Sequence, residues 1–399
     1  MSKRTSRTVA AVVAAATATA LAAGSAPAVA DPSSGSITIE SPPTEPGTYS
    51  RELKATNSNG DSVSEIIVGD FAGGGPLKFD LLLWKSDWSM TSLDPLPGDG
   101  GGSVTAMNNN CTVVGSSRSK TGDYRQHAVR WTSPSTPVEL PALPGDTAAV
   151  ATSVGDDGTA VGSSWNASAK HAVAWAPSGT PVALPPLPGD TESEAVGVNS
   201  SGTAIGYSYP AGDITSLRAV TWAPDGTVTA LDVPAGYVHG SPTRITDSGV
   251  VIGRADTPSG LPHALVWNAS GAVTDLGSGE AKAVNNSGTV VGSQGGQAAR
   301  WAVDGTPLPL APTALAGTAT GINDQGIVVG YTSDPPPARV QLYSQLWNPD
   351  GSLRALPPWS SDFPYSSPVS VSDNGFVLGN ALFRGIAHYG RPLSMRWKL

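Results

Sequence analysis

The residue types that could carry chemistry in this chain lie inside an internal repeat. HAVRWTSPSTPVELPALPGDT at 127–147 is followed by HAVAWAPSGTPVALPPLPGDT at 171–191. Each copy begins with histidine and carries an aspartate near its end, and these two residue types can bind metal or transfer protons. The two copies belong to different units of the repeat. If the units form a ring, corresponding residues of two units lie far apart. We therefore predict structural roles, in which each histidine bonds a turn carbonyl and Asp146 and Asp190 bond backbone N–H groups.

The remaining chemistry-bearing candidates are few. Cys111 is the single cysteine, so the chain has no intramolecular disulfide, and it stands where other units have a turn glycine. We predict a free thiol without a catalytic role. The sequence contains no HExxH, paired CxxC, GxSxG or P-loop motif. These observations predict no catalytic residue, no metal site and no cofactor.

The first 30 residues have the pattern of a secretory signal peptide. MSKRTSR is basic, VAAVVAAATATALAAG is apolar, and Ala28-Val29-Ala30 fits a cleavage site. No later apolar run reaches the roughly 18 residues of a membrane span. We predict cleavage near Ala30 and a secreted domain at 31–399, with no membrane span.

Charge and composition exclude some classes of partner. The net charge is −9, and no basic run is available to neutralise phosphates, so we predict that the chain does not bind nucleic acid. The 47 glycines and 35 prolines indicate many turns, while 39% hydrophobic residues can form a core. We expect a monomer.

Three landmarks recur along the chain. A strand-like run ends in a tryptophan at each of Trp84, Trp131, Trp175, Trp222, Trp267, Trp301, Trp347 and Trp397. An apolar pair ends in a glycine at each of Gly69, Gly115, Gly162, Gly206, Gly253, Gly292, Gly330 and Gly379. A turn rich in Asn, Asp, Ser and Gly precedes each glycine. The tryptophans define eight repeat units, numbered here along the chain.

Within a unit we predict four short antiparallel strands, A to D. Examples are EAVGVN at 194–199, TAVGSS at 159–164, HAVAW at 171–175 and PVALPPL at 181–187. No helical period follows the signal peptide. Four strands in about 45 residues, repeated eight times, predict an all-β fold, a β-propeller of eight four-stranded blades.

The two ends of the chain favour a closed ring over a linear solenoid. The last unit stops at its strand C, in LSMRWKL at 393–399. Residues 36–40 align with strand D of another unit, although no strands A to C precede them in the chain. We predict that this N-terminal strand completes the last blade, whereas a solenoid would have polar caps.

The repeat resembles the HAF family of probable extracellular repeats. The motifs that carry the resemblance are His127-Ala128-Val129, His171-Ala172-Val173 and His263-Ala264-Leu265, each followed by a strand-ending tryptophan, and the GxNxxGxVVG-like segments at 197–206 and 321–330. Arg218 and Gln297 replace the histidine in two units. The resemblance implies an extracellular repeat and no catalytic motif.

We predict that the eight repeated tryptophans pack between blades. A buried tryptophan stabilises the fold by roughly 4–6 kcal/mol, as an upper estimate. The variable connections, B–C and D–A, share one face, and the other aromatics lie in or beside them, where they could stack on sugars, contact a partner or pack the loops. The residues of this predicted ligand face are Trp165, Tyr207, Tyr209, Tyr331, Trp359 and Tyr389.

Two functions remain open from the sequence. The first is a secreted, non-catalytic binding or scaffold module whose partner is an extracellular glycan or protein. The second is a glycan-acting hydrolase or lyase, which needs two carboxylates roughly 5–10 Å apart. The regular repeat without a catalytic motif favours the first.

Overall fold

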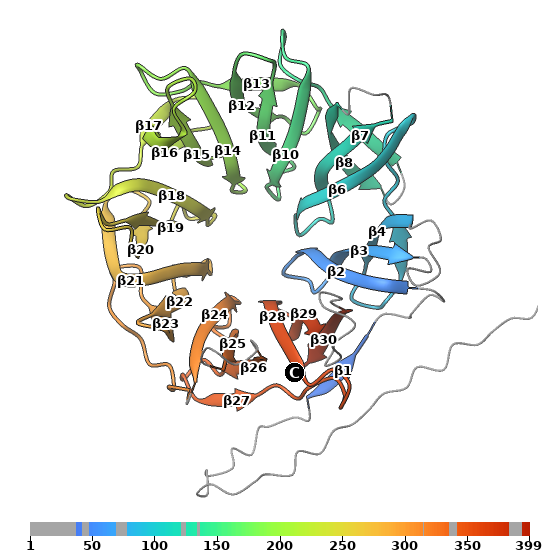
Figure 1. Cartoon of the computed structure of the whole chain (residues 1–399), viewed down its shortest axis with the longest axis vertical. Coiled ribbons are helices and arrows are strands. Elements are labelled where there is room, and N and C mark those ends of the chain that lie inside the picture. Colours follow the sequence, from blue (N-terminus) through green and yellow to red (C-terminus); the bar gives the residue numbers. More distant parts are fainter. Residues whose placement is uncertain are drawn as a thin grey trace, which may run out of the picture.

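The computed structural model describes residues 37–41, 48–68, 78–120, 125–133, 136–313, 315–334, 341–382 and 393–399. The predicted signal peptide lies outside them. Apart from one short turn of helix, the regular elements of the described residues are all β-strands, and they are arranged side by side around a central axis (Figure 1). One short 3-10 turn, η1, covers Ile214–Ser216.

Four sheets have the predicted four-stranded form, with each strand antiparallel to the next along the chain. The first contains β6 (Asp99–Met107), β7 (Val113–Ser119), β8 (Gln126–Ser133) and β9 (Thr136–Leu140). The second contains β10 (Ala148–Val154), β11 (Ala160–Trp165), β12 (Lys170–Trp175) and β13 (Pro181–Leu184). The third contains β14 (Glu192–Val198), β15 (Ala204–Tyr209), β16 (Arg218–Trp222) and β17 (Val228–Ala230). The fourth contains β24 (Ala316–Ile322), β25 (Val328–Ser333), β26 (Leu342–Trp347) and β27 (Leu353–Ala355).

Units five and six share a six-stranded sheet. Its strands are β18 (Val238–Ile245), β19 (Val251–Asp256), β20 (Pro262–Trp267), β21 (Val273–Val284), β22 (Val290–Gln294) and β23 (Gln297–Trp301). The 12-residue β21 pairs with β20 through its first part and with β22 through its second. The predicted fourth strand of unit six is reduced to an isolated bridge between Trp301 and Pro307, so the prediction of four strands is wrong for this unit.

The first and last units share an eight-stranded sheet. It contains β1 (Thr38–Glu40), β2 (Thr48–Thr56), β3 (Ser62–Val68), β4 (Lys78–Trp84), β5 (Met90–Ser92), β28 (Tyr365–Val371), β29 (Phe376–Leu382) and β30 (Leu393–Lys398). A single parallel bridge between Arg51 and Leu393 joins β2 to β30.

The N-terminal strand pairs with the C-terminal strand, as the sequence predicts. β1 runs antiparallel to β30, with Ile39 opposite Trp397. Arg396 strengthens the junction, because its guanidinium donates to Glu40 Oε2 through Nε at 2.7 Å and to the Ser86 carbonyl of unit one through Nη1 at 2.7 Å. Since strand pairing merges some neighbouring units, the count of eight blades stays a prediction.

The recurring glycine is required by a bulge in the inner strand. Opposite Gly206, for example, the register of β14 shifts between Ala195 and Gly197. The bulge turns the Glu194 carbonyl oxygen toward β15, where it lies 1.9 Å from the position that a Cβ on Gly206 would occupy. In unit one the register places Ser64 at this position, opposite Leu53. The assignment of Gly69 is therefore wrong, and Gly69 itself lies outside the described residues.

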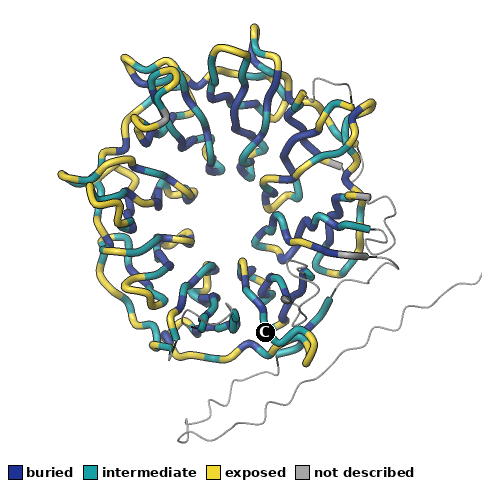
Figure 2. The backbone as a smooth tube through the Cα atoms, in the orientation of Figure 1, coloured by how far each residue is buried: buried dark blue, intermediate teal, exposed yellow. Residues whose placement is uncertain are grey.

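The core lies between neighbouring sheets. Seven hydrophobic clusters of the described residues each combine strands of two consecutive units. One of them joins Leu81 and Leu83 of β4 to Val113 and Trp131 of unit two. Figure 2 shows buried residues running through the sheets and exposed residues gathering toward the outside. The repeated tryptophans are 0–3% exposed. Trp175 Nε1 donates to the Pro141 carbonyl on the connection from the preceding unit, at 2.8 Å, and five other units repeat this bond. The predicted packing role is confirmed.

Candidate functional site

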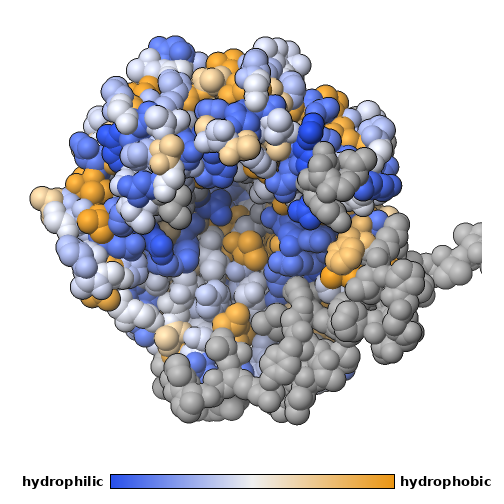
Figure 3. All heavy atoms as spheres, turned by 45° about the horizontal axis from the view of Figure 1, so that its top comes forward, coloured by the Kyte–Doolittle hydropathy of each residue, from blue (hydrophilic) through white to orange (hydrophobic). Residues whose placement is uncertain are grey.

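The inner strands and the turns that follow them surround a central cavity of about 1030 Å³. Figure 3 shows the molecule hollowed at its centre, with hydrophilic residues around the hollow. No single unit contains this cavity, because inner strands from across the ring contribute to its wall. Its size lies at the upper end of the range of roughly 300–1,000 Å³ for small-molecule sites.

Hydrogen bonds between neighbouring units stiffen the cavity wall. The bulged residues of three inner strands are threonines whose Oγ1 donates to a carbonyl of the next inner strand. These bonds join Thr105 to Ala151 at 2.6 Å, Thr152 to Ala195 at 2.8 Å and Thr320 to Pro368 at 2.8 Å. Since each bond joins two units, the wall depends on the whole arrangement.

The turns at the end of the inner strands form one mouth of the cavity. Asn108 Nδ2 donates to the Gly155 carbonyl of the next turn at 2.8 Å, and Asn57, Asn199, Asn285 and Asn323 make the same kind of bond. The turn of unit eight meets that of unit one, where Asn374 Nδ2 donates to the Asn59 carbonyl at 2.7 Å. The asparagines therefore join successive turns, a role that the turn sequences alone do not predict.

Four carboxylates stand at this mouth: Asp156, Asp247, Asp324 and Asp373. Each accepts a backbone N–H from the preceding turn, such as Asn109 N to Asp156 Oδ1 at 2.8 Å. The mouth is thus acidic and rich in hydrogen-bonding groups.

One cation in the wall departs from the repeat. The strand register places Arg244, which pairs with Ile252, where the other inner strands have a small residue. The equivalent residues are Ala55, Ala106, Ser153, Gly197, Ala283, Gly321 and Ser370. A long charged side chain is present at one place in an otherwise small-residue layer.

The surroundings of Arg244 leave it without an acidic partner among the described residues. Its Nε donates to the Lys282 carbonyl at 3.1 Å. Glu280, a carboxylate in the same part of the wall, already pairs with Lys282 and, at 3.5 Å, with Arg254. The Arg244 side chain is exposed to the cavity. The protein atoms of the surrounding wall nevertheless desolvate its guanidinium and lower the pKa of this group.

The repeated histidines and aspartates pair with each other, away from the cavity lining. Asp146 Oδ2 accepts Ser164 Oγ at 2.6 Å and lies 2.9 Å from His171 Nδ1. In a catalytic triad the histidine lies between serine and aspartate, whereas here the aspartate lies between the other two, so the serine has no base. The structural role is supported, but the predicted partners are wrong, because these side chains bond each other instead of backbone groups. Asp190 repeats the arrangement with Ser208 and Arg218.

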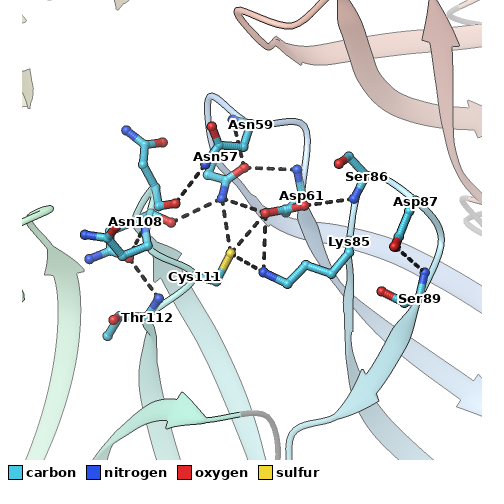
Figure 4. Close-up of polar contacts among 12 residues, drawn as sticks. Asn57, Asn59, Asp61, Lys85, Ser86, Asp87, Ser89, Asn108, Cys111 and Thr112 are labelled. Atoms are coloured by element: carbon cyan, nitrogen blue, oxygen red, sulfur yellow. Dashed lines mark hydrogen bonds and ion pairs between the residues drawn. The ribbon is translucent and has the colours of Figure 1, made fainter.

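Cys111 belongs to a polar cluster between units one and two (Figure 4). Its Sγ lies 2.5 Å from Lys85 Nζ and donates to Asp61 Oδ2 at 3.0 Å. Cys111 adopts φ 59°, the left-handed conformation that glycine adopts at this turn position in the other units. Burial and the Asp61 carboxylate raise the pKa of the thiol above its ordinary value, although Lys85 lowers it in part.

The predicted ligand-face residues are not brought together. Trp165 ends β11, Tyr207 and Tyr209 lie in β15, Tyr331 lies in β25, and Trp359 follows β27. Tyr389 lies outside the described residues. Except for Trp359, the described ones lie in strands that lead into the variable connections, because strand B continues beyond the repeated glycine.

Several of these aromatics are occupied by contacts within the protein. Tyr209 is 3% exposed and its hydroxyl donates to Glu194 Oε1 at 2.9 Å; burial and Glu194 raise the pKa of this hydroxyl. The Tyr207 hydroxyl lies 2.7 Å from Ser241 Oγ. Trp359 packs against Phe363, with ring centroids 5.1 Å apart. Tyr209 therefore packs within the protein, which is one of the roles left open for these aromatics, and the ligand face as a whole stays a prediction.

Sequence comparisons identify no relative: no family model matches the chain, and no curated protein matches it. Solved structures do match. A prolyl endopeptidase structure is 11% identical with a TM-score of 0.51, over 84% of this chain and 54% of that one. A streptogramin B lyase is 9% identical with a TM-score of 0.43, over 91% and 98%. TolB from Acinetobacter baumannii is 13% identical with a TM-score of 0.36, over 74% and 78%.

Such low identities show the fold alone, and the chain spans about half the length of the prolyl endopeptidase. The chain is an all-β protein of propeller type, which confirms this part of the predicted fold. None of the helices among the described residues is long and apolar enough to cross a membrane.

Proposed function

We propose that this protein is a secreted, non-catalytic binding module, an eight-bladed propeller of HAF-like repeats that holds a ligand in its central cavity. The observation that carries the proposal is the large polar cavity, whose wall and mouth are fixed by hydrogen bonds between units. Rigid walls reduce the entropy that binding would otherwise cost. The bonded carboxylates at the mouth are held as hydrogen-bond acceptors.

The composition of the cavity lining supports a polar ligand. The lining combines threonine and serine hydroxyls, asparagine amides and charged side chains with eight valine, isoleucine and methionine residues, so most of its residues are polar or small. An extracellular glycan offers many hydroxyls to such a surface. A protein partner would need a protruding loop to reach into it, so we propose a glycan as the ligand.

The experiment compares a cavity variant with a variant of the predicted ligand face. Thr243→Trp places a bulky ring on an exposed wall residue of β18, whereas Trp165→Ala removes a ring outside the cavity lining. The mature protein and both variants are screened against neutral and acidic extracellular glycans by calorimetry, with thermal melting as the folding control. We expect Thr243→Trp to abolish binding and Trp165→Ala to preserve it.

Two results would overturn the proposal. Binding that survives Thr243→Trp but is lost in Trp165→Ala would move the site to the predicted ligand face. Measurable turnover of a bound glycan would favour the hydrolase or lyase alternative.

A further inference from the structure

We propose that Arg244 is the anchor of an acidic-sugar site in the central cavity and binds the carboxylate of that sugar. The inference rests on the proposed binding function and adds the class of ligand. It starts from the repeat, in which seven equivalent positions hold alanine, serine or glycine and one holds arginine. The small residues of the other seven units fulfil the structural role of this position, so that role does not require an arginine.

Packing at the junction of units five and six explains how the arginine is accommodated. Thr243 Oγ1 donates to the Ile252 carbonyl of its own unit, whereas Thr105 and Thr152 also reach the next unit. Thr246 replaces the bridging asparagine of the turn, and its Oγ1 lies 2.8 Å from Ser248 Oγ. Arg244 Nε instead reaches the Lys282 carbonyl across this junction.

That backbone bond fixes the guanidinium and leaves its outer edge for a ligand. Arginine presents a planar fork of N–H groups that fits a carboxylate through two parallel hydrogen bonds. The Lys282 carbonyl takes the Nε donor, and Glu280 is paired with Lys282 and Arg254. A ligand carboxylate would therefore supply the counter-charge that the described wall does not give Arg244.

The other residues of the cavity indicate which kind of ligand molecule would bear the carboxylate. The four aspartates at the mouth disfavour multiply charged anions and accept hydrogen bonds from hydroxyls. Thr243, Asn285 and Ser200 add neutral polar groups to the lining. A singly charged sugar acid, with one carboxylate and several hydroxyls, matches this distribution better than a phosphate.

The test uses a matched pair of probes, glucuronate and glucose, which differ in the carboxylate. Binding of each to the mature protein is measured by calorimetry or ligand-observed NMR. The variants are Arg244→Gln, which keeps polarity but removes the charge, and Arg118→Gln, an exposed arginine outside the cavity lining as the control. Circular dichroism and melting establish that each variant is folded.

We expect the wild type to prefer glucuronate, and Arg244→Gln to weaken glucuronate binding by at least about tenfold, the loss of a charge-assisted hydrogen bond. Glucose binding and the Arg118→Gln variant should be unchanged. Failure of the wild type to bind glucuronate, or equal glucuronate binding by Arg244→Gln, overturns the inference. If the wild type binds glucose and Thr243→Trp abolishes that binding, the proposed function is supported even when the inference about Arg244 fails. The proposed function and the inference can therefore fail separately.

Discussion

Two residues of this protein differ from the residues at the equivalent positions of the other repeat units. Arg244 is one, and Cys111 is another, because seven other units place glycine at the same turn position. A cysteine in the left-handed conformation costs roughly 1 kcal/mol more than glycine. Its Sγ contacts Lys85 and Asp61, and both neighbours act on its protonation.

Replacing the lysine of this cluster should make the thiol less reactive. Burial and Asp61 raise the pKa of Cys111, and Lys85 is the neighbour that lowers it. In Lys85→Met the pKa should therefore rise further, and since the thiolate is the nucleophile, alkylation at neutral pH should slow. The measurement is the iodoacetamide rate between about pH 7 and 10, around the ordinary thiol pKa. A midpoint that stays in place or moves to lower pH would show that Lys85 does not act on the thiol; Lys120→Met is the control.

At the scale of the element, the inner-strand bulge determines which residue the neighbouring strand can hold. The bulge opposite Gly206 places the Glu194 carbonyl oxygen where a Cβ would have to be, and Gly115, Gly162, Gly253, Gly292 and Gly330 face the same contact. Backbone atoms on both sides cannot move without breaking the sheet. The glycine is therefore a steric requirement of the sheet.

Gly206→Ala should destabilise the protein by more than about 3 kcal/mol, because the new methyl group meets a carbonyl oxygen 1.9 Å away. Gly101→Ala is the matched control, since an added Cβ there has no heavy atom within 4 Å, and we expect a change within about 0.5 kcal/mol. Urea denaturation measures both. Equal effects of the two substitutions would contradict the steric explanation.

At the scale of the whole molecule, the two ends of the chain are held together. β1 pairs with β30, Ile39 is 7% exposed in the core cluster of the last units, and Arg396 bonds both Glu40 and the Ser86 carbonyl of unit one. The turns of units eight and one meet as well, through Asp373 N and the Ser58 carbonyl at 2.9 Å. These contacts join segments from opposite ends of the sequence.

In a protein that starts at residue 31, deleting residues 31–41 should lower the melting temperature by about 5 °C or more, because β30 loses its outer partner and exposes an unpaired edge. Deleting 31–36 alone keeps β1 and should leave the melting temperature nearly unchanged. Differential scanning calorimetry compares both deletions with the protein of residues 31–399. If the longer deletion melts like the shorter one, the N-terminal strand contributes little to ring stability.

The repeat, most of the strands and the pairing of the two chain ends can be predicted from the amino-acid sequence. These features depend on local patterns: alternation in short strands, Asx-Gly turns, a tryptophan at each strand end and a spare strand at the N-terminus. Arg244 was also visible, since aligning the units on their turns places it among alanine, serine and glycine. The local patterns did not reveal that unit six lacks a fourth strand. The segment expected to form it pairs with β23 through one bridge, between Pro307 and Trp301.

The contacts between units depend on the tertiary fold. Asn108 and the Gly155 carbonyl are 47 residues apart, and Asn374 and Asn59 are 315 apart, so no local pattern specifies either bond. The carboxylate partner of His171, the burial of Tyr209 and the cavity itself depend in the same way on which units lie side by side. A strand pattern fixes which residues share a face, but only the arrangement of the sheets decides whether that face meets solvent, a neighbour or the central cavity.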